Sequence, residues 1–316
     1  MSVTVVRTAQ GWALRRPGGI IAIDTAATTT AELLADRAAI DAAMSSSDDA
    51  CQPTDGAALL SPITAPCRVI AQMANYRSHA IDAGFAPDRV PPAFFRKSSG
   101  SIAHPTGDVV RPAHVRFLDY EVELALVIGR EIPVGTTITA ANLVEAVAGL
   151  VVANDISARD LQLPQTQFYE SKSYPGFTPL GPHLVLTDAV DLVRLPELRL
   201  RLDVNGTVRQ DMPASDMLVT PARALTLLSR FQQLSPGDVL LTGTPGGTVL
   251  KSPPPLVAKI GALLPPHVKW KAFFGKQEKN PLWLNPGDVM TTSIATDDGA
   301  LDLGTQQTTV RAAEPA

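Results

Sequence analysis

The chain has 316 residues, enough for one large domain or two, and its 45% hydrophobic content and formal net charge of −4 are typical of a globular protein. The charge balance argues against nucleic acid as a partner, and neither the apolar stretches nor the N-terminus has the length or pattern of a membrane span or signal peptide. Cys51 and Cys67 lie in no metal or redox spacing, so we expect free thiols in a cytoplasmic protein.

The first 66 residues predict a small N-terminal β/α domain, ahead of a catalytic domain over residues 67–316. Residues 2–25 contain three short apolar stretches separated by Gly-containing turns, which predicts a β-meander. Apolar residues at helical spacing predict one helix over residues 30–43. No residue in this region points to chemistry, so we interpret it as packing or dimer support.

His79 and Asp82 follow a predicted strand at residues 67–73. They are three residues apart, so one helical turn would place them on the same face. A carboxylate beside an imidazole orients it and raises its basicity, as a general base near neutral pH requires. The alternative is that His79 is a surface residue ahead of the Pro-rich run 86–92.

Residues 93–102 predict a strand that ends in a basic, hydroxyl-rich turn containing Lys97. Such a turn can hold an anionic substrate group, and the alternative is a solvated strand end.

Alternating carboxylates mark the strand predicted at residues 118–129. Asp119, Glu121 and Glu123 are two residues apart, so their side chains share one face of the strand. The opposite face is apolar and consists of Leu118, Tyr120, Val122 and Leu124. Burying three like charges without a positive partner is very costly. This face is therefore either exposed to solvent or covered by something positive, and we favour a bound cation.

Asp155 follows a second predicted buried strand at residues 149–154. With Glu121 and Glu123 it would complete an all-oxygen site, which suits Mg²⁺ or Mn²⁺, with Ca²⁺ as a possible substitute in crystals. The chain has five His and no HxH, HExxH or paired CxxC, which argues against a zinc site. The alternative for Asp155 and Asp160 is turn capping.

Lys172 precedes a Pro/Gly-rich loop and is a candidate charge partner for a bound substrate, or a solvated lysine at the edge of the loop. Further elements predicted from the sequence are a helix at 139–147 with Thr139 as its N-cap, a hairpin around Asn205-Gly206, a helix at 220–234 and a strand followed by a Gly-rich turn at 235–247. The unit Pro-Gly-Asp-Val at 236–239 recurs at 286–289 and indicates the start of two strands.

Seven segments together resemble the fumarylacetoacetate hydrolase superfamily, over most of residues 68–311. They are NYRSHAIDAG, FFRKSSGSI, DYEVELALVIG, VVANDISARDLQ, KSYPGFTPLGPHLV, LSPGDVLLTGTPGG and LNPGDVMTTSI. The resemblance implies an α+β, mainly β, mixed sandwich roll with few helices, a homodimer, and Mg²⁺ or Mn²⁺ as the cofactor. It implies metal ligands at Glu121, Glu123 and Asp155.

The resemblance also implies catalytic roles for His79 and Asp82 on a lid and for Lys172, and places Thr244 near the substrate carboxylate. We expect substrate contacts from Tyr76, Lys97, Arg159, Gln162 and Thr244. The predicted reaction is hydrolysis of a C–C bond in an acylpyruvate-type 2-oxo acid, with water activated by His79 and Asp82. Alternatives are a metal-dependent 2-oxo acid decarboxylase or tautomerase that uses the same ligands, and a non-catalytic metal-binding protein.

Two departures from the family pattern stand out. The acid of the dyad is Asp82, where the family usually has Glu, one methylene longer. Residues 248–283 form a long basic insertion containing Trp270, Phe273, Phe274 and Trp283. We expect it to cover the site or a dimer neighbour and to enlarge an apolar part of the pocket, or else to serve only as packing or interface.

Overall fold

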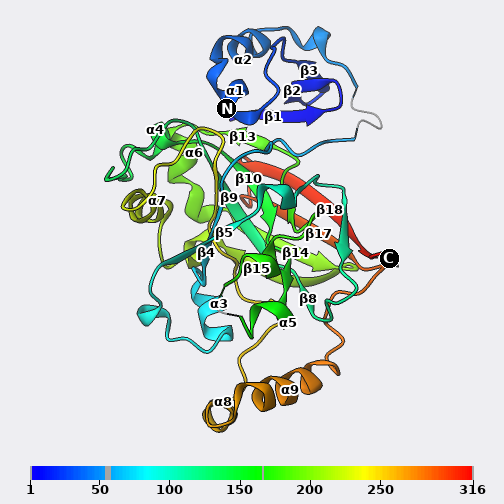
Figure 1. Ribbon diagram of the computed structural model, residues 1–316. Coiled ribbons are helices and arrows are strands. Elements are labelled where there is room, and N and C mark those ends of the chain that lie inside the picture. Colours follow the sequence, from blue (N-terminus) through cyan, green and yellow to red (C-terminus); the bar gives the residue numbers. More distant parts are fainter. Residues whose placement is uncertain (1, 54–57, 166, 315–316) are drawn as a thin grey trace.

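A computed structural model describes residues 2–53, 58–165 and 167–314 of the chain. Its centre is a pair of stacked β-sheets with few helices around them (Figure 1). The larger sheet has the order β3 (Gly19–Ala22), β2 (Gly11–Arg16), β1 (Val3–Thr8), β13 (Leu184–Leu186), β10 (Val147–Asn154), β9 (Val122–Ile128), β16 (Val239–Leu241), β4 (Val69–Met73) and β5 (Ala93–Lys97). The second sheet has the order β15 (Thr207–Pro213), β14 (Arg199–Val204), β17 (Val289–Ala295), β18 (Asp302–Ala312) and β7 (Asp108–Arg111).

Short strands and helices complete the chain. Two small sheets pair β11 (Ser157–Ala158) with β8 (Leu118–Asp119) and β12 (Thr178–Pro179) with β6 (Ile102–Ala103). The described α-helices are α1 (Thr30–Ala35), α2 (Arg37–Met44), α3 (Arg77–Asp82), α4 (Leu143–Ala146), α5 (Arg159–Gln162), α6 (Ala189–Val193), α7 (Pro221–Ser229), α8 (Pro255–Ala262) and α9 (Pro266–Gln277). None of them is long and apolar enough to cross a membrane. The predicted mainly β class with few helices is confirmed.

The predicted N-terminal meander forms as β1–β3 and extends the larger sheet, because β1 pairs antiparallel with β13. The predicted single helix over 30–43 is wrong: the chain breaks at Asp36. That carboxylate accepts hydrogen bonds from the Ala39 N–H at 3.3 Å and the Thr25 hydroxyl at 2.6 Å, so it caps α2 instead of continuing α1. The helix predicted at 139–147 likewise shortens to α4, because the Asn142 side chain accepts from the Thr139 N–H at 2.7 Å.

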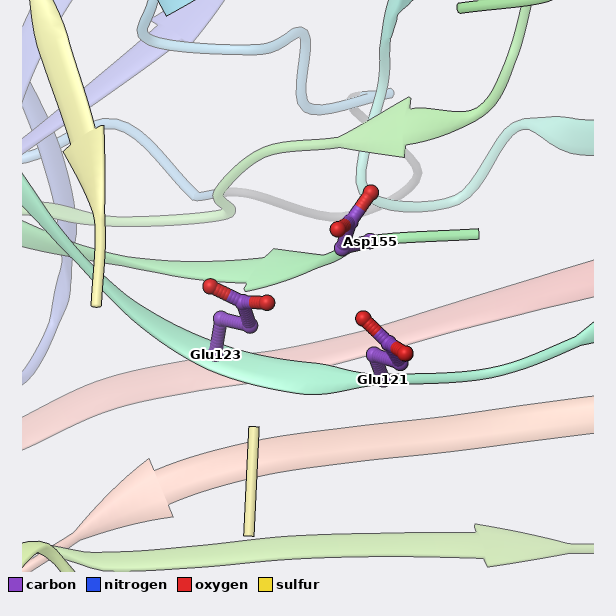
Figure 2. Close-up of side chains that lie close together, drawn as sticks. All are labelled: Glu121, Glu123 and Asp155. Atoms are coloured by element: carbon purple, nitrogen blue, oxygen red, sulfur yellow. The ribbon is translucent and has the colours of Figure 1, made fainter. Parts of the chain in front are cut away.

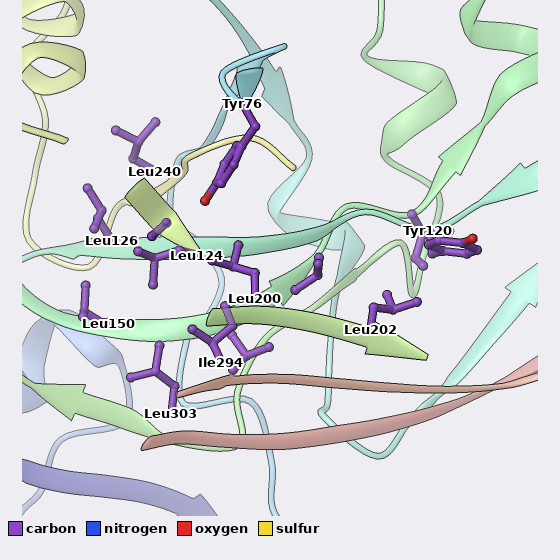
Figure 3. Packing of buried hydrophobic residues seen from close by; sticks show 14 of the residues in the cluster. Tyr76, Tyr120, Leu124, Leu126, Leu150, Leu200, Leu202, Leu240, Ile294 and Leu303 are labelled. Carbon is purple, nitrogen blue, oxygen red and sulfur yellow. The ribbon is translucent and has the colours of Figure 1, made fainter. Parts of the chain in front are cut away.

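A leucine-rich core fills the space between the two sheets (Figure 3). Leu124, Leu126 and Leu150 project from the larger sheet toward Leu200 and Ile294 of the smaller one. A second core covers the opposite face of the larger sheet; there Ala125 and Val127 of β9 meet side chains from the meander and from α1 and α2. Because successive side chains of a strand point to opposite faces, β9 contributes to both cores and is buried along its whole length.

The two Pro-Gly-Asp units form the same turn before β16 and β17. Gly237 and Gly287 have φ of +82° and +97°, the third-residue conformation of a type II turn that glycine adopts without strain. In each turn the Asp carboxylate accepts a hydrogen bond from the N–H three residues before it, 2.8 Å from Ser235 to Asp238 and 2.7 Å from Asn285 to Asp288. The predicted strand starts are therefore confirmed.

The insertion 248–283 forms α8 and α9, which project from the body (Figure 1). Phe274 of α9 and Trp283 pack on Phe117, with ring centroids 5.5 Å and 5.2 Å away. In contrast, α8 exposes large apolar side chains, among them Leu256 and Ile260. The insertion is thus anchored at its C-terminal end by an aromatic cluster.

We predict that Asp238→Ala lowers the free energy of unfolding by about 2–3 kcal/mol, and Asp288→Ala by about 1 kcal/mol, in urea titrations. Asp238 is buried and accepts from the N–H groups of Arg68 and Ser235 and from the Arg68 side chain, so its loss leaves three partly buried donors without that acceptor. Asp288 makes the equivalent turn closer to solvent. Equal losses for the two variants would contradict this ranking.

Candidate metal centre and active site

Three buried carboxylates converge at one end of the larger sheet (Figure 2). Glu123 lies on β9, Glu121 in the short break between β8 and β9, and Asp155 directly after β10. One oxygen from each side chain lies within 4.8 Å of the others. The three ligands predicted from the sequence are therefore brought together by the fold.

Strand register explains the convergence. In the antiparallel pair of β9 and β10, Ala153 lies opposite Glu123 and Asn154 opposite Val122. The Asp155 N–H donates to the Glu121 carbonyl at 2.8 Å, and the Asn154 side chain accepts from the Glu121 N–H at 2.9 Å. This strand pairing places Asp155 beside Glu121 and Glu123, which lie more than thirty positions earlier in the chain.

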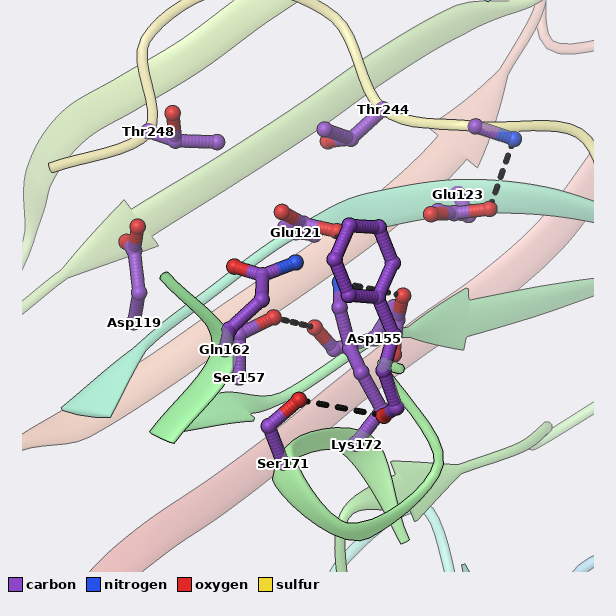
Figure 4. A network of polar contacts seen from close by, with 12 residues as sticks. Asp119, Glu121, Glu123, Asp155, Ser157, Gln162, Ser171, Lys172, Thr244 and Thr248 are labelled. Carbon is purple, nitrogen blue, oxygen red and sulfur yellow. Dashed lines mark hydrogen bonds and ion pairs between the residues drawn. The ribbon is translucent and has the colours of Figure 1, made fainter. Parts of the chain in front are cut away.

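Two buried lysines form ion pairs with the carboxylates, and Figure 4 shows one of them, Lys172. Lys172, at the end of a short 3₁₀ turn over Glu170–Lys172, lies 2.6 Å from both a Glu121 oxygen and an Asp155 oxygen. Lys97 contacts the other Asp155 oxygen and donates to the Phe177 carbonyl at 2.9 Å. Burial opposes the charge on Lys172, but Asp155 and Glu121 outweigh it and raise its pKa.

Arg159 connects the acidic cluster to its surroundings. Its guanidinium contacts Glu121 at 2.5 Å and Asp119 at 2.8 Å, and it donates to the Gln162 side chain at 2.7 Å. Asp119 also accepts from the Val249 N–H at 3.0 Å, so it anchors the start of the insertion. Asp119 thus lies outside the three-carboxylate group and orients the arginine that contacts Glu121.

Glu123 is the carboxylate with the least compensation. It accepts a hydrogen bond from the Gly243 N–H at 2.7 Å, and no cation of the described chain lies within ion-pair distance of it (Figure 4). Burial, followed by the charges of Asp155 and Glu121, raises its pKa well above the ordinary value. Lys172 and Arg159 overcome burial at Glu121 and lower the pKa of that group.

The donor set fits a hard divalent cation. Asp119, Glu121, Glu123 and Asp155 carry four formal negative charges, against three positive charges on Lys97, Arg159 and Lys172. The remaining negative charge lies at the group of oxygens from Glu121, Glu123 and Asp155, which could bind Mg²⁺ or Mn²⁺. The fold itself does not select between these ions.

A small cavity opens over the three carboxylates. Its volume available to the centre of a water-sized sphere is about 50 Å³, and a water needs ~10–15 Å³ on this scale. The lining residues come from the ends of β4, β9 and β10, from α3, β5 and α5, from the segment 168–172 and from the turn after β16. They are Gln72, Met73, Ala74, His79, Phe95, Glu121, Glu123, Asp155, Arg159, Gln162, Phe168, Lys172 and Thr244. None of them belongs to residues 248–283, so the insertion does not extend this cavity in the described chain, contrary to expectation.

His79 and Asp82 both lie on α3, as predicted, but they are not hydrogen-bonded to each other. The His79 Nδ1 is buried without a partner, and burial lowers the pKa of its imidazole. The Asp82 carboxylate instead accepts from the Gly247 N–H at 3.0 Å and contacts the Lys251 ammonium. The expected contact between the two side chains is therefore not made, because the Asp82 carboxylate is bonded to a backbone amide and a lysine. The catalytic roles of His79 and Asp82 stay predictions.

Two expected substrate contacts need correction. Tyr76 is fully buried in the core between the sheets (Figure 3) and does not line the cavity. Lys97 is buried behind Asp155 and contacts that carboxylate instead of the cavity. Arg159, Gln162 and Thr244 do line the cavity. The Thr244 hydroxyl accepts from the Gln210 side chain at 2.8 Å, which fixes its position.

The sequence reasoning missed the aromatic wall of the cavity. Phe95 and Phe168 meet edge to face with ring centroids 5.5 Å apart, and the Lys172 ammonium lies 5.4 Å from the centroid of Phe95. Phe95 lies in the strand that we singled out for its basic end, but strand alternation alone did not indicate which side faces the site. Nothing in the sequence around Phe168 indicated this position.

We predict that Glu123→Gln abolishes Mg²⁺ binding and makes the metal-free protein more stable than the parent at pH 8. A carboxyl group with a raised folded-state pKa loses stabilisation as the pH rises through that pKa, above the ordinary 4.5. The difference in unfolding free energy between Glu123→Gln and the parent protein should therefore shrink as the pH falls toward 4.5. Urea titrations in the presence of a chelator measure this difference.

Glu121→Gln is the matched control for this prediction. The pKa of Glu121 is lowered, so the same substitution there removes ion pairs with Lys172 and Arg159 and should destabilise the metal-free protein at pH 8. The same sign of effect for both variants would contradict the charge assignment.

Comparison with known proteins agrees with this geometry. Residues 68–311 match the family model described as fumarylacetoacetate (FAA) hydrolase C-terminal. The chain is 36% identical over 212 residues to the oxaloacetate tautomerase Fahd2a, mitochondrial, of Rattus norvegicus, and this match covers 66% of the chain and 65% of the rat protein. The chain thus spans less than two thirds of that relative.

Solved structures match over nearly the whole chain. A probable 2-hydroxyhepta-2,4-diene-1,7-dioate isomerase from Mycobacterium abscessus is 30% identical, with a TM-score of 0.73 and 100% coverage of both chains. Fumarylacetoacetate hydrolase from Exiguobacterium antarcticum is 28% identical, with a TM-score of 0.74, 99% coverage of this chain and 100% of the other. Through its family match, its fold and its three converging carboxylates, the chain belongs to the fumarylacetoacetate hydrolase family.

Proposed function

We propose that this protein is a metal-dependent tautomerase or isomerase of small 2-oxo dicarboxylic acids, with oxaloacetate as the model substrate. The observation that carries the proposal is the state of α3: His79 reaches the cavity with an unpartnered Nδ1, while Asp82 is bound elsewhere. Tautomerisation moves one proton and needs no activated water. An unpolarised imidazole suits that task better than it suits hydrolysis.

The size and charge of the site favour a small anionic substrate. The cavity has room for only a few water-sized spheres, which suits a four-carbon acid better than a long acyl chain. Arg159 and Lys172 line it, and the Gln162 and Thr244 side chains add polar groups. Positive groups in a water-poor cavity attract carboxylates strongly, because little solvent screens the charges.

The chain's residues can divide the reaction between them. Enol-to-keto conversion removes a proton from the C2 hydroxyl and adds one at C3, through an enolate. His79, neutral because burial lowers its pKa, is placed to take up and return that proton. Lys172 keeps its charge and can stabilise the enolate together with Arg159. A divalent cation held by Glu121, Glu123 and Asp155 would supply Lewis-acid stabilisation of the same charge.

Relatives support this reaction class. The rat relative is named an oxaloacetate tautomerase, and the Mycobacterium abscessus structure is titled a probable dioate isomerase. Both reactions shift a proton on a 2-oxo acid skeleton and leave the carbon chain intact.

Hydrolysis of an acylpyruvate is the second candidate. It is favoured by the position of Asp82 one turn after His79 and by similarity to the fumarylacetoacetate hydrolase from Exiguobacterium antarcticum. A 2-oxo acid decarboxylase would use the same carboxylates, and a non-catalytic protein would bind the metal without turnover. The expected homodimer and the cytoplasmic location stay predictions.

A substrate panel separates these functions. With Mg²⁺ or Mn²⁺, we expect the protein to accelerate loss of the ultraviolet absorbance of enol-oxaloacetate above the spontaneous rate, with little pyruvate formed from an acylpyruvate. Pyruvate plus a carboxylic acid as the main products would identify a hydrolase, and release of CO₂ from oxaloacetate a decarboxylase. Metal binding without any turnover would leave the non-catalytic alternative.

We predict that His79→Gln lowers the tautomerase rate by about 10²–10⁴-fold, the usual loss when an acid–base group is removed. Mg²⁺ binding, measured by calorimetry, should persist because the carboxylates stay in place. His114→Gln is the matched control, since that imidazole is exposed and bonds Tyr174 outside the cavity. A fully active His79→Gln protein would exclude the proposed proton transfer.

A further inference from the structure

Helix α3 is tied to the loop after β16 by four contacts. The Ser78 hydroxyl accepts from the Gly246 N–H at 2.8 Å, and the Asp82 carboxylate accepts from the Gly247 N–H at 3.0 Å. The Asp82 carbonyl accepts from the Ser252 N–H at 2.8 Å, and the Lys251 ammonium pairs with the Asp82 carboxylate. The single charged contact in this group comes from the first residues of the insertion.

From these contacts we infer that Lys251 is a specificity-determining residue: by pairing with Asp82 it keeps that carboxylate away from His79 and thereby suppresses hydrolysis in favour of proton transfer. This inference rests on the proposed function. Lys251 does not line the cavity, so it acts by positioning Asp82 and not by contact with the substrate.

Asp82 lies on the same helix as His79, at a spacing that allows the two side chains to meet. Residues three apart on a helix are neighbours, with Cβ atoms about 5–6 Å apart. The Nδ1 of His79 is buried without a partner, so it has an unfilled hydrogen-bonding position. Asp82 therefore has two alternative partners, the exposed end of Lys251 and the buried imidazole.

The ion pair between Lys251 and Asp82 is weak enough for Asp82 to change partners. The Asp82 carboxylate has one charged donor, Lys251, and one neutral donor, the Gly247 amide. The side chains of Lys251 and Asp82 are 51% and 25% exposed, and solvent weakens ion pairs of this kind. Removal of the Lys251 charge should thus be enough to redistribute Asp82 toward His79.

The step that Lys251 suppresses is the cleavage of an acylpyruvate. With Asp82 bonded to Nδ1–H, His79 takes a proton from water as the water oxygen bonds to the distal acyl carbon. The bond between that carbon and C3 breaks, and its electron pair stays on C3 as the enolate. C3 then takes up the proton from His79, which yields a carboxylic acid and pyruvate.

The test compares tautomerase and hydrolase rates of the full chain with Mg²⁺. Lys251→Ala should raise acylpyruvate cleavage on the order of threefold to tenfold, the range expected from an exposed charged contact, with the tautomerase rate unchanged. The gain should vanish in the double variant Lys251→Ala/Asp82→Asn. Lys251→Arg should keep the low cleavage rate, and Lys259→Ala is the control for loss of an exposed lysine on α8.

A spectroscopic readout separates positioning from a merely structural role. The ¹⁵N resonance of His79 Nδ1, assigned by its absence in His79→Gln, should shift in Lys251→Ala and return in the double variant. Unchanged cleavage and an unchanged resonance in Lys251→Ala would overturn the inference, as would parallel loss of both activities. Absence of tautomerase activity from the parent protein would instead overturn the proposed function.

Discussion

The site depends on the burial of a charge cluster at the end of two paired strands. Four carboxylates are held against Lys97, Arg159 and Lys172 with almost no solvent contact. Desolvation would make such a cluster unstable without these cations. Lys97 and Arg159 also donate hydrogen bonds to the Phe177 carbonyl and to the Gln162 side chain. The compensation is incomplete at Glu123, and the unbalanced charge there is what makes the group a candidate for a divalent cation.

The packing of the larger sheet holds this charge cluster in place. β9 is buried on both faces, between the core against the second sheet and the core beneath the N-terminal meander. The charged cluster lies at the N-terminal end of the strand, near Glu121 and Glu123. A frame of this kind holds the three carboxylates close together despite their repulsion.

The proposed choice between proton transfer and hydrolysis depends on a part of the molecule outside the carboxylate cluster. Proton transfer and hydrolysis share the same carboxylates, lysines and histidine, so these groups do not choose between the reactions. We propose that the distinction lies in the hydrogen-bond partners of α3, which contacts the loop after β16 and the start of the insertion. On this proposal, the insertion acts on the reaction through the Lys251–Asp82 pair, although the insertion does not line the cavity.

By itself the sequence determined the strands, the turns and the candidate ligands, because these follow from local rules: alternation on a strand, Pro-Gly turns, and carboxylates at strand ends. Alternation correctly separated Glu121 and Glu123 from Leu118, Tyr120, Val122 and Leu124. Only the tertiary structure decided the partners. Lys97 pairs with Asp155, Tyr76 enters the core, and Asp82 turns to Lys251, because residues distant in sequence compete for the same groups and local spacing carries no information about that competition.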